Sequence, residues 1–140
     1  MHEGLGWKKL QAHIEQTIIQ AKQEEELNQI TEDFESVVKR FGHAASELLF
    51  KRNLDSEKFM ADASLFLEAT GILCIGWMWL RQAVSAQKAL SQGASDQGFY
   101  FGKIETATYY MEYELVKIQG LISRFHSTSF PTVKMQSDWF

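Results

Sequence analysis

Residues that interrupt or cross-link a chain are scarce in this sequence. Its 140 residues include one proline, one cysteine and nine glycines. Because proline and glycine disfavour helix interiors, their scarcity favours long helices. A single cysteine excludes an intramolecular disulfide. Cys74 lies in an apolar run, so we interpret it as a small core residue rather than a reactive thiol.

Two further features are missing, an apolar leader and an excess of positive charge. The first residues do not form the apolar segment of a signal peptide. Fourteen Lys and Arg residues against eighteen Asp and Glu residues give a net charge of −4, which argues against a nucleic acid or an anionic membrane surface as partner. With 45% hydrophobic residues, the chain can form one globular domain. We therefore expect a cytoplasmic globular domain.

The stretch Leu65–Val84 is the most apolar part of the sequence. In and just before it, apolar residues recur at steps of three and four, which is the spacing of one helix face. They are Phe59, Ala63, Phe66, Thr70, Leu73, Trp77, Leu80 and Val84. The residues between them are also apolar, and such a helix is typically buried on every side. We predict a long central helix that begins at a cap, Asp55 or Ser56, and ends near Leu90.

We do not interpret this stretch as a membrane span. Its uncharged part, from Ala69 to Leu80, is shorter than the ~20 apolar residues that cross a bilayer. Glu68 and Arg81 bound it and would lie at membrane depth in any longer span. Because glutamate is rarely buried, we interpret Glu68 as a residue on the solvent side of the helix rather than as a buried base.

Three other helices are predicted from apolar stripes at helical spacing. The first covers about Trp7–Asn28, and the second begins at an N-cap, Thr31, and ends near Asn53. The last runs over about Asp96–Phe125, after a turn at Ser91–Ser95.

Four helices with short connections predict an all-α fold, an up-and-down four-helix bundle with a buried long third helix. We assign residues 1–126 to this bundle and expect residues 127–140 to form an irregular tail, since they lose the helical period and contain the proline.

The sequence shows no pattern of catalytic, cofactor-binding or metal residues. Di-iron bundles use Glu-x-x-His pairs, and no glutamate here is followed by histidine three residues later. Phosphate-binding glycine loops and a GxSxG motif are also missing. His43 and Glu47 lie one helical turn apart, which we interpret as a surface pair. His2, His13 and His126 are scattered.

Two segments resemble a known family. GILCIGWMWLRQA, Gly71–Ala83, resembles a GxxxxGWxWLRxA signature, and FYFGKIETA, Phe99–Ala107, resembles FYxGKxxTA. Both are signatures of the extra C-terminal helical domain of large bacterial acyl-CoA dehydrogenases, a group that includes the methylthiopropionyl-CoA dehydrogenases. The resemblance covers about Ala61–Leu121. The chain departs from it at Thr108, where arginine is usual, and at Val116-Lys117, where Leu-Pro is usual.

The resemblance implies a parent enzyme of fatty acid metabolism that oxidises acyl-CoA thioesters between Cα and Cβ with FAD. The flavin and the catalytic carboxylate would belong to the preceding domains, so no catalytic or cofactor residue is transferred to this chain. We expect a non-catalytic accessory domain that serves subunit packing or shapes the substrate entrance. Its expected partners are the dehydrogenase core domains and further copies of the chain. The alternative is a free-standing helical interaction module.

Two sets of positions are candidate sites. Gly76 and Gly102 are predicted to mark close helix crossings. Glycine destabilises a helix interior, and close packing of a neighbouring helix would offset that loss of stability. Ile75, Met78 and Trp79 lie on the side of the long helix opposite its buried stripe, and we predict that they form an interface. Their cover would be a second copy, the dehydrogenase core, or the tail through Phe130, Trp139 and Phe140. Alternatively, the helix is central and these residues belong to the core.

Overall fold

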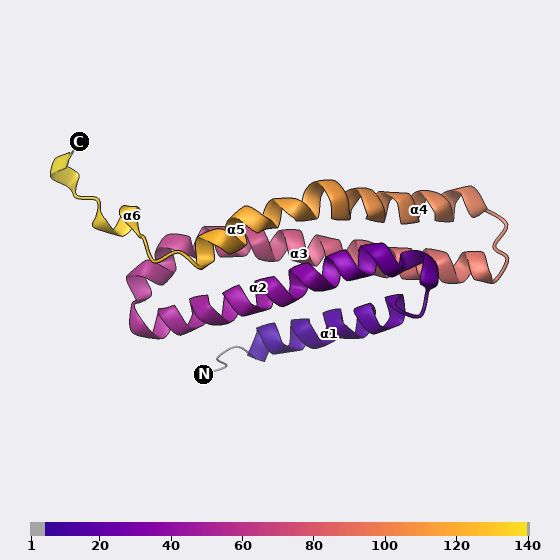
Figure 1. Ribbon diagram of the computed structural model, residues 1–140, viewed down its shortest axis with the longest axis horizontal. Helices are drawn as coiled ribbons and strands as arrows, with labels where there is room; N and C mark the ends of the chain where they lie inside the picture. The colour runs from indigo at the N-terminus through magenta and orange to yellow at the C-terminus, as the bar shows by residue number, and fades with distance from the viewer. Residues whose placement is uncertain (1–4, 140) are drawn as a thin grey trace.

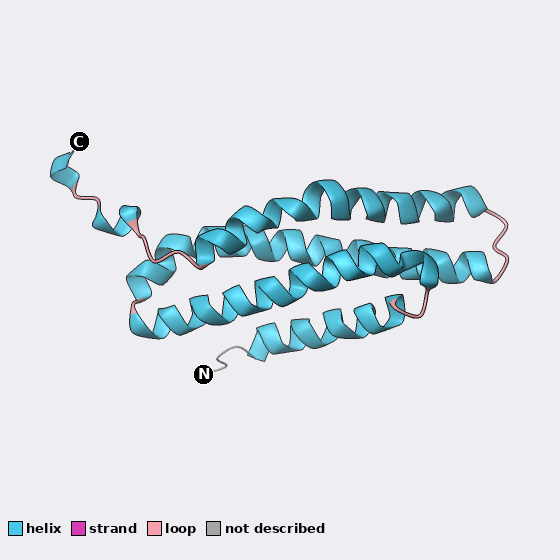
Figure 2. Cartoon of the chain, viewed as in Figure 1, coloured by secondary structure: helices cyan, strands magenta, loops and turns pink. Residues whose placement is uncertain are grey.

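The computed structural model describes residues 5–139, and long helices dominate it (Figure 1). The helices alternate in direction, and the described residues contain no strand (Figure 2). The four arms are α1 (Leu5–Ala21), α2 (Asn28–Leu54), α3 (Ser56–Ser91), and α4 (Gln97–Tyr109) continued by α5 (Ile118–Phe125). The predicted all-α, up-and-down four-helix bundle is confirmed.

The connection between α1 and α2 corrects two predicted boundaries. α1 ends at Ala21 rather than near Asn28, and a 3-10 turn, η1 (Glu25–Leu27), leads directly into α2. Thr31 is therefore not an N-cap. It is buried inside α2, where its hydroxyl donates to the Leu27 carbonyl at 2.7 Å. Because Leu27 is buried, the chain turns toward the core after Ala21, and the polar segment does not continue α1.

Both caps around the second half of the bundle are aspartates. The Asp55 side chain accepts from the Lys58 amide at 3.2 Å and begins α3, as predicted. Asp96 accepts from the Phe99 amide at 3.2 Å and begins α4. In the turn between α3 and α4, Gly93 has φ +76°, a left-handed conformation that glycine adopts without steric cost.

The last arm is not one uniform α-helix. A π-helical turn, η2 (Tyr110–Glu114), and a 3-10 turn, η3 (Leu115–Lys117), separate α4 from α5. Ala107, Met111 and Leu115 are all buried and lie four residues apart. Two α-turns advance only ~7.2 residues, so the wider π-turn keeps all three residues on the core side.

The core lies between α2, α3 and the α4–α5 arm. Its largest fully buried side chains include Phe34, Phe41, Leu73, Leu80, Leu115, Ile118 and Phe125. Partly buried Phe66 joins two of them, because its ring stacks on Phe41 at 5.6 Å and meets Phe125 edge-on at 5.9 Å. α1 adds buried Ile14, Ile18 and Ala21 to this core. The Trp77 indole Nε1 also donates to the Thr17 hydroxyl of α1 at 2.7 Å.

α3 is the central helix, but it is not buried on every side. It contacts α1, α2, α4 and α5, yet Leu67 and Ile75 are exposed on its outer face. The expectation of burial all round was wrong, because three neighbouring arms leave the fourth side of a helix open. By length and composition alone, α3 also meets the requirement for a membrane span.

The segment after α5 contains two short helices, α6 (Pro131–Lys134) and η4 (Ser137–Trp139). It leaves the bundle at the end where α2 turns into α3 (Figure 1). Phe130 is buried there, with the Lys58 ammonium 5.9 Å and the Arg124 guanidinium 5.0 Å from its ring centroid. Trp139 is exposed, and Phe140 lies outside the described residues.

Candidate interaction surface

The segments Gly71–Ala83 and Phe99–Ala107 face each other across the α3–α4 contact. Lys103 Nζ on α4 donates to Gln82 Oε1 on α3 at 3.0 Å. The same ammonium lies 5.5 Å from the ring centroids of Trp79 and Phe99, a cation–π distance. One lysine of the second segment therefore joins a tryptophan of the first to a phenylalanine of its own helix.

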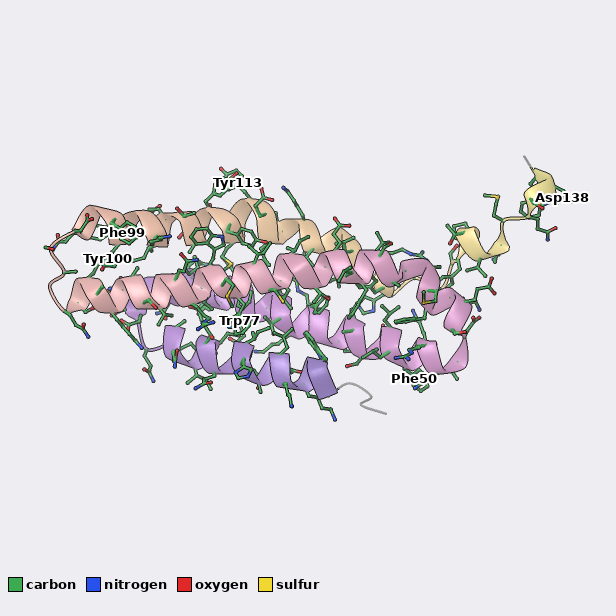
Figure 3. All side chains as sticks on the ribbon, turned by 180° about the vertical axis from the view of Figure 1, so that it is seen from behind. Phe50, Trp77, Phe99, Tyr100, Tyr113 and Asp138 are labelled. Carbon is green, nitrogen blue, oxygen red and sulfur yellow. The ribbon has the colours of Figure 1, made fainter. Side chains whose placement is uncertain are left out.

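A groove of about 330 Å³ opens beside this contact, between the last turns of α3 and the first turns of α4. Figure 3 shows Phe99 and Tyr100 at this end of α4. The side chains that define the groove are Met78, Arg81, Gln82, Phe99, Tyr100 and Lys103. Among the described residues, two cations and no carboxylate line it, so it combines apolar surface with positive charge in a protein whose net charge is −4.

Arg81 is positioned by its neighbours in α3. Its guanidinium lies 5.5 Å from the Trp77 ring centroid, and its Nη1 lies 3.9 Å from the Met78 sulfur. Trp77 also stacks on His13 at 6.4 Å and donates to Thr17. Because Trp77 is held by α1, it gives Arg81 a fixed surface to lie on.

Gly76 lies at a close approach of three elements. A Cβ there would meet Phe34 Cε2 at 3.1 Å, and Tyr110 Cε1 and Leu115 Cδ1 at 3.4 Å. Tyr110 uses this approach to donate its hydroxyl to the Ile72 carbonyl at 2.9 Å. Burial, and then the charge of Glu114, raise the pKa of Tyr110 to about 12.

Gly102 does not mark such an approach. It is exposed on α4, and an added Cβ would meet no atom within 4 Å. Gly71 on α3 is equally open. The expectation for Gly102 assumed that a glycine inside a helix faces a neighbouring helix, whereas this one lies on a side of α4 that none of the described helices covers.

The chain belongs to a recognised family. A family model described as acetyl-CoA dehydrogenase C-terminal like matches residues 10–136. No curated protein and no solved structure matches the chain significantly.

Membership of the acetyl-CoA dehydrogenase C-terminal-like family supports an accessory domain of such enzymes. The match extends beyond the motif-bearing region into α1, α2 and the tail. The resemblance to this C-terminal domain is thereby confirmed, but the narrower methylthiopropionyl-CoA dehydrogenase group is not distinguished.

The three residues predicted as an interface differ in their surroundings. Ile75 is 51% exposed, with the described part of the tail in place. Met78 is half-buried and lines the groove. Trp79 is half-buried, packs against the core and lies beside Lys103. The exposed part of this face is therefore Ile75 and the groove, whereas Trp79 supports the surface from below.

A second aromatic surface lies further along the last arm. Tyr109 and Tyr113 are exposed, and their rings stack at 4.7 Å with an interplanar angle of 14°. Tyr113 lies on the outer side of the arm (Figure 3).

The polar candidates considered from the sequence fall into two groups. Glu68 is exposed, and burial raises the pKa of the half-buried Cys74 thiol, which makes it less reactive. His43, Glu47 and His126, by contrast, lie together, with ligand atoms within 4.8 Å of one another. Sequence spacing indicated the His43–Glu47 pair, but His126 lies 79 residues from Glu47, and no local pattern brings it there.

Proposed function

We propose that this chain is a non-catalytic accessory domain that docks onto the core of an FAD-dependent acyl-CoA dehydrogenase through the α3–α4 surface. In that position it packs subunits together or shapes the substrate entrance. Family membership supplies the class of partner, and the groove supplies the contact surface.

The observation that carries this proposal is the placement of the motif residues. Four of them are buried, so packing of the core accounts for their presence in the motifs: Gly76, Leu80, Ala83 and Ala107. Arg81, Phe99 and Lys103 instead line an open groove. Arginine and aromatic residues are enriched at interfaces, and an apolar groove rimmed by cations suits a partner surface that carries apolar and acidic groups.

The proposal assigns FAD and the acyl-CoA chemistry to the core domains and no residue of this chain to either. We further propose that the parent enzyme belongs to the narrower methylthiopropionyl-CoA dehydrogenase group, acts in fatty acid metabolism and is cytoplasmic. The proposal also treats α3 as a bundle helix rather than a membrane span, because its buried Asp62 is paired with Arg124 inside the bundle.

Sedimentation equilibrium of the chain mixed with the catalytic core of a bacterial acyl-CoA dehydrogenase tests the proposal. We expect a complex that Ile75→Glu and Lys103→Glu each weaken by at least ~tenfold, the cost of a charge placed against a complementary surface. Ile19→Glu is the matched control, because Ile19 is 62% exposed on α1, away from the groove.

Failure of the wild-type chain to bind the core would contradict the docking proposal and favour the free-standing interaction module. Self-association of the chain without the core, if Ile75→Glu abolishes it and Ile19→Glu does not, would show that the same surface joins copies of the chain. If Ile75→Glu unfolds the chain instead, this surface belongs to the core.

A further inference from the structure

A cluster of three side chains outside the groove joins α2 to the end of α5. His43 and Glu47 lie one turn apart on α2, and His126 follows the last residue of α5. Glu47 Oε2 lies 2.6 Å from His126 Nδ1, and Glu47 Oε1 lies 3.5 Å from His43 Nδ1. The two imidazole rings are tilted by 46° to each other, with centroids 5.7 Å apart. One carboxylate thus bridges two imidazoles.

We propose that His43, Glu47 and His126 form a binding site for a divalent transition-metal ion, with Zn²⁺ as the representative ion. Two imidazole nitrogens and one carboxylate oxygen are a donor set that zinc accepts. Imidazole donors favour Zn²⁺, Ni²⁺ and Cu²⁺, whereas Mg²⁺ and Ca²⁺ prefer oxygen donors alone.

The distances fit this ion after small side-chain rotations. Zinc bonds of ~2.0–2.1 Å place tetrahedral ligand atoms about 3.3 Å apart. The donor atoms here already lie within 4.8 Å of one another. The shortest separation, between Glu47 and His126, has to open slightly because a metal ion would replace the proton between them. All three side chains are at least partly exposed, so an ion can enter, and water can fill the remaining coordination position.

Lys51 holds His126 in reach of α2. Its ammonium donates to the carbonyls of Phe125 and Ser127 at 2.8 and 3.3 Å, on either side of His126. These two hydrogen bonds fix the C-terminal turn of α5 against α2 before any ion binds. The site is therefore preorganised by the fold, and an ion bound there would link the two helices a second time.

Zinc titration of the chain against a chromophoric chelator, together with thermal unfolding, tests this site. We expect binding of one ion and a Tm that rises with Zn²⁺ concentration, because the ion binds the folded state. His43→Gln, Glu47→Gln and His126→Gln should each weaken binding by at least ~tenfold, since even outer-shell changes cost that much at metal sites. Addition of Co²⁺ should produce a visible absorption band that the His126→Gln variant lacks.

Two matched controls separate this site from other histidines. His13→Gln changes an exposed histidine on α1 and should leave zinc binding unchanged, as should His2→Gln. Unchanged affinity in His126→Gln, with circular dichroism showing a folded chain, would overturn the three-ligand site. So would loss of binding in either control, or no binding by the wild type. Mg²⁺ should give no Tm shift, and a shift equal to that of Zn²⁺ would also contradict the proposal.

Discussion

The Oδ1 atom of Asp62 on α3 accepts a hydrogen bond from Nε of Arg124 on α5 at 3.0 Å. The two side chains are unequally buried, with 5% of the Asp62 side chain and 27% of the Arg124 side chain exposed. The arginine can therefore reach water if its partner is removed, whereas the aspartate cannot. Arg124 also lies over the Phe130 ring, so this ion pair connects α3, α5 and the beginning of the tail.

This inequality predicts asymmetric effects of substitution. Arg124→Met leaves a buried carboxylate without its partner and should lower the free energy of unfolding by ~3 kcal/mol. Asp62→Asn leaves a guanidinium that can hydrate, and should cost only ~1 kcal/mol. Urea unfolding measures both values. The double variant should be more stable than Arg124→Met alone, and equal costs for the two single variants would contradict the asymmetry.

Gly76 and Gly102 should respond in opposite directions to the same substitution. Gly76→Leu places a side chain against Phe34, which is fully buried and cannot move aside, so overpacking should destabilise the fold by ~1–3 kcal/mol. Gly102→Leu adds a side chain where no atom lies within 4 Å and should stabilise the helix by ~0.8 kcal/mol. Thermal unfolding of the two variants gives the comparison. A lower Tm for Gly102→Leu would show that this face is covered by something.

The helices could be predicted from the sequence because their apolar periods and aspartate caps are local signals. Asp55 is such a cap. The end of α1 could not be predicted, since burial of Leu27 decides it and burial depends on the assembled core. The position of Thr31 inside α2 has the same cause.

Some parts of the candidate sites could not be predicted from the sequence, because they depend on contacts between segments that are distant along the chain. Gly76 and Gly102 look alike in the sequence, yet only the fold places Tyr110 and Leu115 against the first and nothing against the second. His126 meets Glu47 because α5 ends beside α2. The π-turn at Tyr110–Glu114 could not be predicted from the sequence, since the same apolar spacing is compatible with a continuous α-helix.

The hydrogen bond between Trp77 and Thr17 should measure how firmly α1 is attached. The Thr17 hydroxyl accepts from the Trp77 indole at 2.7 Å and donates to the His13 carbonyl at 3.1 Å. Thr17→Val leaves the indole N–H without an acceptor and should cost ~1–2 kcal/mol in urea unfolding. Thr106→Val is the matched control, because Thr106 is exposed and bonds only to the Gly102 carbonyl of its own helix. Its effect should stay within ~0.5 kcal/mol.

Tyr110 should make the protein less stable in strong alkali. Its pKa is raised from 10.0 to about 12, by burial first and by Glu114 second. Below pH 10 the hydroxyl is protonated in both the folded and the unfolded state. Its contact with Ile72 then contributes fully to the free energy of unfolding. Between pH 10 and about 12 the unfolded state releases this proton while the folded state retains it. The unfolded state is then favoured, and stability falls as the pH rises through this range.

Urea midpoints measured below pH 10 and then toward pH 12 test this dependence. Tyr110→Phe removes the titrating hydroxyl and should lose less stability over that interval than the wild type, although it starts lower because the hydrogen bond to the Ile72 carbonyl is gone. Tyr113→Phe, which changes an exposed tyrosine on the same arm, should follow the wild-type curve. If the Tyr110→Phe and wild-type curves are parallel, the Tyr110 hydroxyl ionises equally in both states and is not shielded by the α3 contact.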